Sequence, residues 1–195
     1  MLYGLKYAKA PLAGEEAAAS TSSVDYSLGD SFNLRLLIHY IGDIHQPLHD
    51  TTMFSSDFPN GDRGGNSFTL LPTDGIKELH ALWDSVVDKY PNDMDVPLSS
   101  DSWTTLGDIS SALRGAHPAS DFDDLDNSYK TWSSEGYQIA KDFVYANIQQ
   151  DSWPSSDYIT KGQAIADKQL AKGGYRLAAA LVNMWGGLST EVTQE

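Results

Sequence analysis

The sequence predicts an all-α protein built as a single helical bundle, and two observations support this prediction. Several segments place apolar residues at the helical intervals i, i+3, i+4 and i+7. The chain has 195 residues, of which 41% are hydrophobic, which is enough to form one substantial core. It contains no cysteine, so no disulfide bond contributes to that core. We therefore expect one domain spanning residues 1–195.

The first two predicted helices each carry an apolar stripe. The stripe residues are Leu34, Leu37, Ile38 and Ile41 in one helix, and Leu79, Leu82, Trp83 and Val86 in the other. Residues 8–23, ahead of the first helix, show no sustained period and are predicted to form a loop. Between the helices, turn-forming residues dominate 51–66 and a short apolar run follows at 68–71, which predicts a small hairpin or loop insertion.

Three further helices are predicted over residues 104–113, 131–148 and 161–188, where apolar residues recur at helical spacing. Residues 91–102 and 114–128 are expected to be loops. Gly173-Gly174 lies inside the last predicted helix, where glycine costs helix stability. This pair predicts either close packing against another helix or a break.

Two histidine–aspartate pairs are spaced to share one helix face. His39 precedes Asp43 by four residues, and His80 precedes Asp84 by the same interval, so each pair can clamp one ion. Both pairs lie off the apolar stripe of their helix. His49 follows closely, and four of the five histidines fall between positions 39 and 80. This concentration indicates a multinuclear metal site.

The types of residue in the chain restrict which metals it can bind and how it can meet a charged substrate. Imidazole nitrogen and carboxylate oxygen together suit zinc, manganese or iron, and the lack of cysteine excludes thiolate-type structural zinc sites. The formal net charge of −14 argues against a broad basic surface that grips duplex nucleic acid. A polyanionic substrate must therefore be met locally, and bound divalent ions can supply the positive charge.

Each candidate site residue also has a purely structural interpretation. A hydrogen-bonded polar seam between helices would explain the His/Asp pairs equally well from spacing alone. His45 would point toward the apolar stripe, which favours a core histidine or one that hydrogen-bonds a metal ligand. Asp62 and Asn66 lie in a glycine-rich turn, where turn formation is a sufficient role, although Asn66 is also a candidate substrate contact. Trp83 is expected to pack in the core.

The order and spacing of these motifs resemble the S1/P1 nucleases, which share a helical fold with bacterial zinc phospholipase C. The matching segments are HYIGDIHQPLH at 39–49, DRGGN at 62–66, LHALWD at 79–84, WSSE at 132–135 and GYRLA at 174–178. The resemblance spans roughly residues 32–183 and is strongest over 34–84.

The resemblance implies specific metal ligands. It makes His49, His80 and Asp84 the ligands of one zinc, makes His39 and Asp43 part of a second set, and makes Asp43 the bridge toward a third ion. Family members complete the second and third sites with a mature amino-terminal tryptophan and with further His and Asp residues ahead of the segment that matches His39. This chain has no histidine there. We expect an amino-terminal segment to be missing from this sequence.

The implied activity is metal-assisted hydrolysis of single-stranded DNA or RNA, and of 3′-nucleotides, to 5′-phosphorylated products. Family resemblance also implies a secreted, lysosomal or vacuolar location, although the sequence shows neither a signal peptide nor a membrane span. Two alternatives use the same residues. One is a zinc-binding fragment with a structural or binding role, and the other is a phospholipase C-like lipid phosphodiesterase.

Overall fold

The computed structural model describes residues 26–73, 75–90, 96–125 and 128–185, so the loop predicted over residues 8–23 lies outside it. The helices are α2 (Tyr26–Asp43), α3 (Leu79–Asp84), α4 (Ser100–Ala116), α5 (Tyr129–Ile139) and α6 (Ser156–Trp185). Strands β1 (Thr69–Thr73) and β2 (Ile76–Glu78) form an antiparallel hairpin between α2 and α3. Shorter helical turns are η1 (Pro47–Asp50), η2 (Ala119–Asp121) and η3 (Ala140–Val144). The predicted all-α fold with a small hairpin insertion is confirmed.

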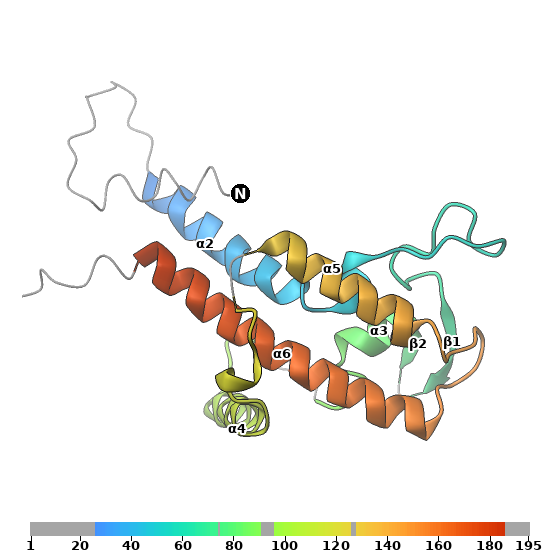
Figure 1. Ribbon diagram of the computed structural model, residues 1–195. Coiled ribbons are helices and arrows are strands. Elements are labelled where there is room, and N and C mark those ends of the chain that lie inside the picture. The colour runs from blue at the N-terminus through green and yellow to red at the C-terminus, as the bar shows by residue number, and fades with distance from the viewer. Residues whose placement is uncertain (1–25, 74, 91–95, 126–127, 186–195) are drawn as a thin grey trace, which may run out of the picture.

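The long helix α6 runs the length of the molecule, and α2 lies antiparallel beside its carboxy-terminal half (Figure 1). Gly173 permits this approach, because a Cβ atom there would lie 3.1 Å from the ring of His45. Helix α6 continues through both glycines without interruption. Of the two outcomes predicted for Gly173-Gly174, the structure therefore shows close packing.

The core consists of two clusters of buried apolar residues, one that includes α3 and one that includes α2. One contains Leu79, Leu82 and Trp83 of α3 together with residues of the hairpin, η3 and α6, which confirms Trp83 as a core residue. The other joins Leu37 and Ile41 of α2 to α5 and α6. Ile38 was predicted to join that stripe, but it is 43% exposed. It lies about 100° around the helix from Leu37, which turns it away from both partner helices.

Several predicted boundaries are wrong, for identifiable reasons. Helix α3 ends at Asp84 because Val86, Val87 and Asp88 all have positive φ angles, and Val87 takes the buried place predicted for Val86. Helix α4 begins at Ser100, inside the loop predicted for 91–102, and it extends into the loop predicted for 114–128. The helix predicted over 131–148 changes into the π-helical turn η3 after Ile139.

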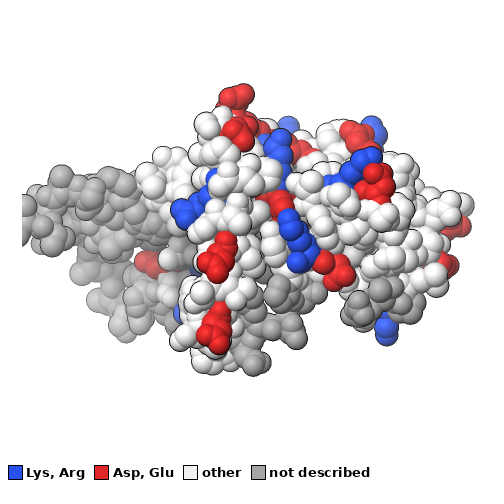
Figure 2. All heavy atoms as spheres, turned by 90° about the horizontal axis from the view of Figure 1, so that it is seen from below, with Lys and Arg blue, Asp and Glu red and all other residues white. Residues whose placement is uncertain are grey.

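Helix α4 is attached loosely. Its apolar residues Leu106, Ile109 and Leu113 lie on one side, as their spacing predicts, and line a cavity of about 610 Å³ between α4 and α6. None of its 17 residues is buried. The face of the molecule that includes α4 carries Lys and Arg side chains interspersed with Asp and Glu (Figure 2). None of the described helices combines the length and apolar character needed to cross a membrane.

Candidate metal centre

Three separate segments bring the predicted metal-binding side chains to one place. His39 and Asp43 lie on the last turn of α2, His49 lies in η1, and His80 and Asp84 lie on α3. A turn held by backbone hydrogen bonds, including one from the His45 amide to the carbonyl of Gly42, connects α2 to η1. Pro47 then starts η1, as its fixed φ angle and missing N–H allow. His49 is thereby carried to the space between the two helix-borne pairs.

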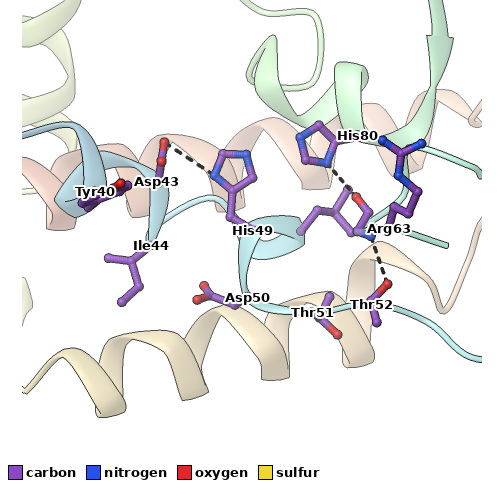
Figure 3. A pocket seen from close by; sticks show the side chains of 11 residues that line it. Tyr40, Asp43, Ile44, His49, Asp50, Thr51, Thr52, Arg63 and His80 are labelled. Atoms are coloured by element: carbon purple, nitrogen blue, oxygen red, sulfur yellow. Dashed lines mark hydrogen bonds and ion pairs between the residues drawn. The ribbon is translucent and has the colours of Figure 1, made fainter. Parts of the chain in front are cut away.

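The five side chains alternate histidine and aspartate in a continuous row. The distances between facing nitrogen and oxygen atoms are 3.1 Å for His39–Asp43, 3.6 Å for Asp43–His49, 3.3 Å for His49–Asp84 and 3.3 Å for Asp84–His80. The rings of His49 and His80 stack with centroids 5.0 Å apart. Figure 3 shows Asp43, His49 and His80 at the wall of one cavity. Asp43 thus lies between two imidazoles, the position that a bridging ligand needs.

His49, His80 and Asp84 meet the geometric requirement for one ion. One ligand atom from each lies within 4.8 Å of the other two. The Nδ1 of His80 lies 2.7 Å from the carbonyl oxygen of Gly64, so Nδ1 carries the proton and Nε2 keeps its lone pair on the side of Asp84. Three ligands of this kind, with a fourth position open, match catalytic metal sites. The residues present therefore fit a divalent metal ion.

Hydrogen bonds between neighbouring side chains shift the pKa values of His49 and Asp84. A hydrogen bond with Asp84 raises the pKa of His49 above its ordinary value, with Asp43 contributing in the same direction. Partial burial opposes ionisation of Asp84, but hydrogen bonds from His49 and Gln46 outweigh it and lower its pKa. Asp84 is therefore held as a carboxylate, the form that binds a metal.

Gln46 supports the site and was missed in the sequence. Its Nε2 donates a hydrogen bond of 2.8 Å to Asp84, and its Oε1 accepts one of 2.6 Å from the amide of Leu48. One side chain therefore ties the turn that carries His49 to the helix that carries Asp84. Its partner lies 38 residues away, so no local spacing reveals the contact.

Replacing Gln46 with methionine is expected to weaken zinc binding by about 10- to 100-fold, because both of these hydrogen bonds are lost while the volume is kept. Competition against a chromogenic chelator measures the change. Gln138→Met, on the exposed side of α5, is the matched control. Equal zinc affinity for Gln46→Met and the unaltered chain would rule out this supporting role.

A buried carboxylate organises the glycine-rich loop beside the five alternating His and Asp side chains, which we call the metal-binding row because they are the candidate metal ligands. Asp62 is fully buried and accepts hydrogen bonds from the amides of Met53, Gly64 and Gly65. The hydroxyls of Thr52 and Tyr145 donate to it as well. The same loop presents the Gly64 carbonyl to His80, so Asp62 positions this candidate metal ligand through the backbone. This fits the turn role predicted for Asp62.

Asn66, the predicted substrate contact, is exposed and turned toward its own loop. Its Nδ2 donates a 2.9 Å hydrogen bond to the carbonyl of Arg63. Asn66 is not among the described residues that line the cavity beside the metal-binding row. A substrate role for Asn66 stays a prediction.

His45 is a core residue, as one of its two predicted roles requires, but it does not bond a metal-binding side chain. Its Nδ1 donates to the carbonyl of Ile41, and its Nε2 accepts from Arg176, which fixes a neutral tautomer. Arg176 is fully buried and also pairs with Glu135 and Asp124. This polar cluster joins α2, α5 and α6 beneath the metal-binding row.

The contribution of His45 to the free energy of unfolding is expected to fall as the pH drops from about 6.5 toward 4, because burial lowers the pKa of His45 to about 4. Between these two pH values His45 binds a proton in the unfolded chain but not in the folded chain. Acid therefore favours unfolding through His45, by roughly 3 kcal/mol over the full range. Urea unfolding with chelator present measures this. The difference in stability between the unaltered chain and His45→Gln isolates this contribution, because Asp50, whose pKa burial raises to about 7, and His49 titrate in both proteins and cancel. An unchanged pH dependence in His45→Gln would contradict the assignment.

Two cavities adjoin the metal-binding row on different sides. One, of about 690 Å³, is lined by Tyr40, Asp43, His49, Arg63 and His80 among others. The other, of about 440 Å³, is reached by His39, His49 and Asp84 together with apolar residues of α6. The row is therefore open to small molecules or to an extended chain.

Known proteins are similar in sequence to this chain over most of its length. The S1/P1 Nuclease family model matches residues 8–185. Endonuclease 4 of Arabidopsis thaliana is 30% identical over 176 residues, which cover 83% of this chain and 52% of that protein. Endonuclease 2 of the same plant is 28% identical, over 86% of this chain and 56% of that protein. Nuclease S1 of Aspergillus oryzae is 27% identical, over 76% and 52%.

The chain thus spans about half the length of the curated relatives it matches. The match is broad within this chain, since the family model reaches from the residues ahead of α2 to the end of α6. It includes the whole row from His39 to Asp84. The helical fold, the grouped His and Asp side chains and this family match agree, and the chain belongs to the S1/P1 nuclease family.

Proposed function

We propose that this chain is the metal-binding part of a zinc-dependent phosphodiesterase that hydrolyses single-stranded DNA or RNA, and 3′-nucleotides, to 5′-phosphorylated products. The observation that carries the proposal is the row of five alternating His and Asp side chains from three segments, open to a cavity of about 690 Å³. Membership of a nuclease family supports it.

The side chains have distinct roles in this proposal. His49, His80 and Asp84 hold one ion, and Asp43 with His39 contributes to a neighbouring ligand set as a bridging carboxylate. Bound zinc supplies a water of lowered pKa and positive charge at the reacting phosphate. The Gly64 carbonyl and Gln46 keep His80 and Asp84 oriented for that task.

Preference for single strands follows from an aromatic side chain on the cavity wall. Tyr40 lines the cavity and is 46% exposed, so its ring is available to a base that is not paired. Stacking of a base on an aromatic ring contributes about 1 to 3 kcal/mol and tolerates any base. A base within a duplex is already stacked and cannot reach it.

Metal content and substrate choice together test the proposal. The chain is loaded with zinc, its metal is counted by elemental analysis, and hydrolysis of single-stranded DNA, duplex DNA and phosphatidylcholine is compared with and without chelator. Chelator-sensitive cleavage of single-stranded DNA supports the proposal. Cleavage of phosphatidylcholine alone would favour the lipid phosphodiesterase. One zinc per chain without hydrolysis would favour a zinc-binding fragment, since His49, His80 and Asp84 form the one such group found among the described residues.

We also propose that the protein acts in a secreted, lysosomal or vacuolar compartment, as the family resemblance implies. Its net charge of −14 and its lack of cysteine are compatible with any of these. Fractionation of the source cells and their medium, followed by antibody detection, tests this part of the proposal. Recovery in the cytosol alone would contradict it.

A further inference from the structure

One positively charged side chain faces the cavity beside the metal-binding row. Among the described residues that line this cavity, Arg63 is the only lysine or arginine, and Asp43 and Asp50 are acidic. In Figure 3 the Arg63 side chain rises beside His80, on the far side of the row from Tyr40. A substrate strand lying along the cavity would meet Tyr40 at one end and Arg63 at the other.

The backbone holds Arg63 in a fixed and costly conformation. Its φ angle is +59°, in the left-handed region that residues other than glycine rarely adopt. Asp62, the preceding residue, is fully buried and anchored by its hydrogen bonds. The carbonyl of Arg63 accepts a hydrogen bond from Asn66. The loop thus fixes the point from which the Arg63 side chain leaves the backbone.

The guanidinium group of Arg63 is left available. Within the described residues it makes no ion pair or hydrogen bond, although the chain has 27 acidic residues. Both acids of the row are already engaged, Asp43 by His39 and His49, and Asp84 by His49 and His80. A planar guanidinium offers paired donors that match the oxygens of a phosphate.

Arg63 is also coupled to the metal-binding row. The next residue, Gly64, accepts the hydrogen bond of His80 through its carbonyl. A Cβ on Gly64 would lie 2.5 Å from the carbonyl oxygen of Leu48, so this stretch of loop cannot shift freely. The loop therefore fixes Arg63 and His80 relative to each other.

We propose that Arg63 binds a phosphodiester of the substrate strand next to the one being cleaved, and so favours oligonucleotides over mononucleotides. This rests on the proposed function, which puts the reacting phosphate at His49, His80 and Asp84. In a chain of net charge −14, a single available arginine at the cavity supplies local attraction for the strand.

The variants are chosen to remove the charge without straining the loop. Arg63→Asn and Arg63→Gly both tolerate a positive φ angle, and Arg63→Lys keeps the charge but loses the paired donors. Arg114→Gln removes an exposed arginine on α4, away from this cavity, as the matched control. Circular dichroism and thermal unfolding establish that each variant is folded.

Binding is measured by calorimetry in zinc buffer, with thymidine 5′-phosphate, a mononucleotide that the proposed reaction does not cleave, and with a thymidine trinucleotide carrying phosphorothioate linkages that resist cleavage. Arg63→Asn and Arg63→Gly should bind the trinucleotide about tenfold or more weakly, while the mononucleotide changes less than twofold. The salt dependence of trinucleotide binding should fall by about 0.7 in slope, as expected for one lost contact. Arg63→Lys should lie in between, and Arg114→Gln should match the unaltered chain.

Two results would overturn this inference and leave the proposed function standing: unchanged trinucleotide binding in both charge-removing variants, or an equal loss for both ligands. Failure of the unaltered chain to bind either ligand would instead defeat the proposed function, and the role of Arg63 with it.

Discussion

Replacing Asp84 with alanine is expected to abolish zinc retention at the group formed with His49 and His80, with a loss of affinity of more than about 100-fold. The carboxylate faces both imidazoles at 3.3 Å, so its removal leaves two ligands where three are needed. Its loss should exceed the 10- to 100-fold effect typical of residues that only support a ligand. Elemental analysis after dialysis measures the retained metal.

The control for this change is Asp108→Ala, which removes an exposed acid from α4. Both variants make the net charge less negative by one, so a difference between them reports the site and not the net charge. Zinc content equal to that of the unaltered chain in Asp84→Ala would contradict the assignment of this residue as a ligand.

Replacing Asp62 with alanine is expected to lower the free energy of unfolding by about 3 to 5 kcal/mol, because a buried carboxylate is removed and its donors are left unpaired. Three backbone amides and two hydroxyls lose their acceptor at once. Urea unfolding of the metal-free chain measures the effect. Zinc affinity should fall as well, since Gly64 would no longer be held in position to accept from His80.

Asp57→Ala is the comparison for Asp62→Ala, because Asp57 belongs to the same loop but is exposed. Asp62→Asn should give an intermediate loss, since it keeps one acceptor oxygen and adds a donor. A loss below about 1 kcal/mol in Asp62→Ala would show that the loop relaxes and finds other partners.

The parts of the centre that could be predicted are those encoded by local spacing. The pairs His39–Asp43 and His80–Asp84 depend on one helical turn each, and both helices form where the apolar stripes predict them. Joining the two pairs through His49 required the family resemblance, because no periodicity relates residue 49 to residue 80.

The parts that could not be predicted depend on contacts between distant residues. Gln46 reaches Asp84 across 38 positions, Tyr145 reaches Asp62 across 83, and Arg176 reaches His45 across 131. A polar side chain at such a distance leaves no periodic signal, and its partner is set by tertiary packing. The prediction that Ile38 packs with its stripe was wrong for a related reason. Apolar spacing identifies a stripe on a helix but does not show how much of that stripe the neighbouring helices cover.

The loose attachment of α4 has a consequence for how the molecule opens. A helix with no buried residue loses little contact when it detaches, so its amide hydrogens should exchange with solvent through a local fluctuation far cheaper than global unfolding. The carboxy-terminal half of α6, which packs against α2, should exchange only when the whole chain unfolds. Since His39, His49 and His80 lie on other segments, α4 can detach and reattach while the three imidazoles keep their positions.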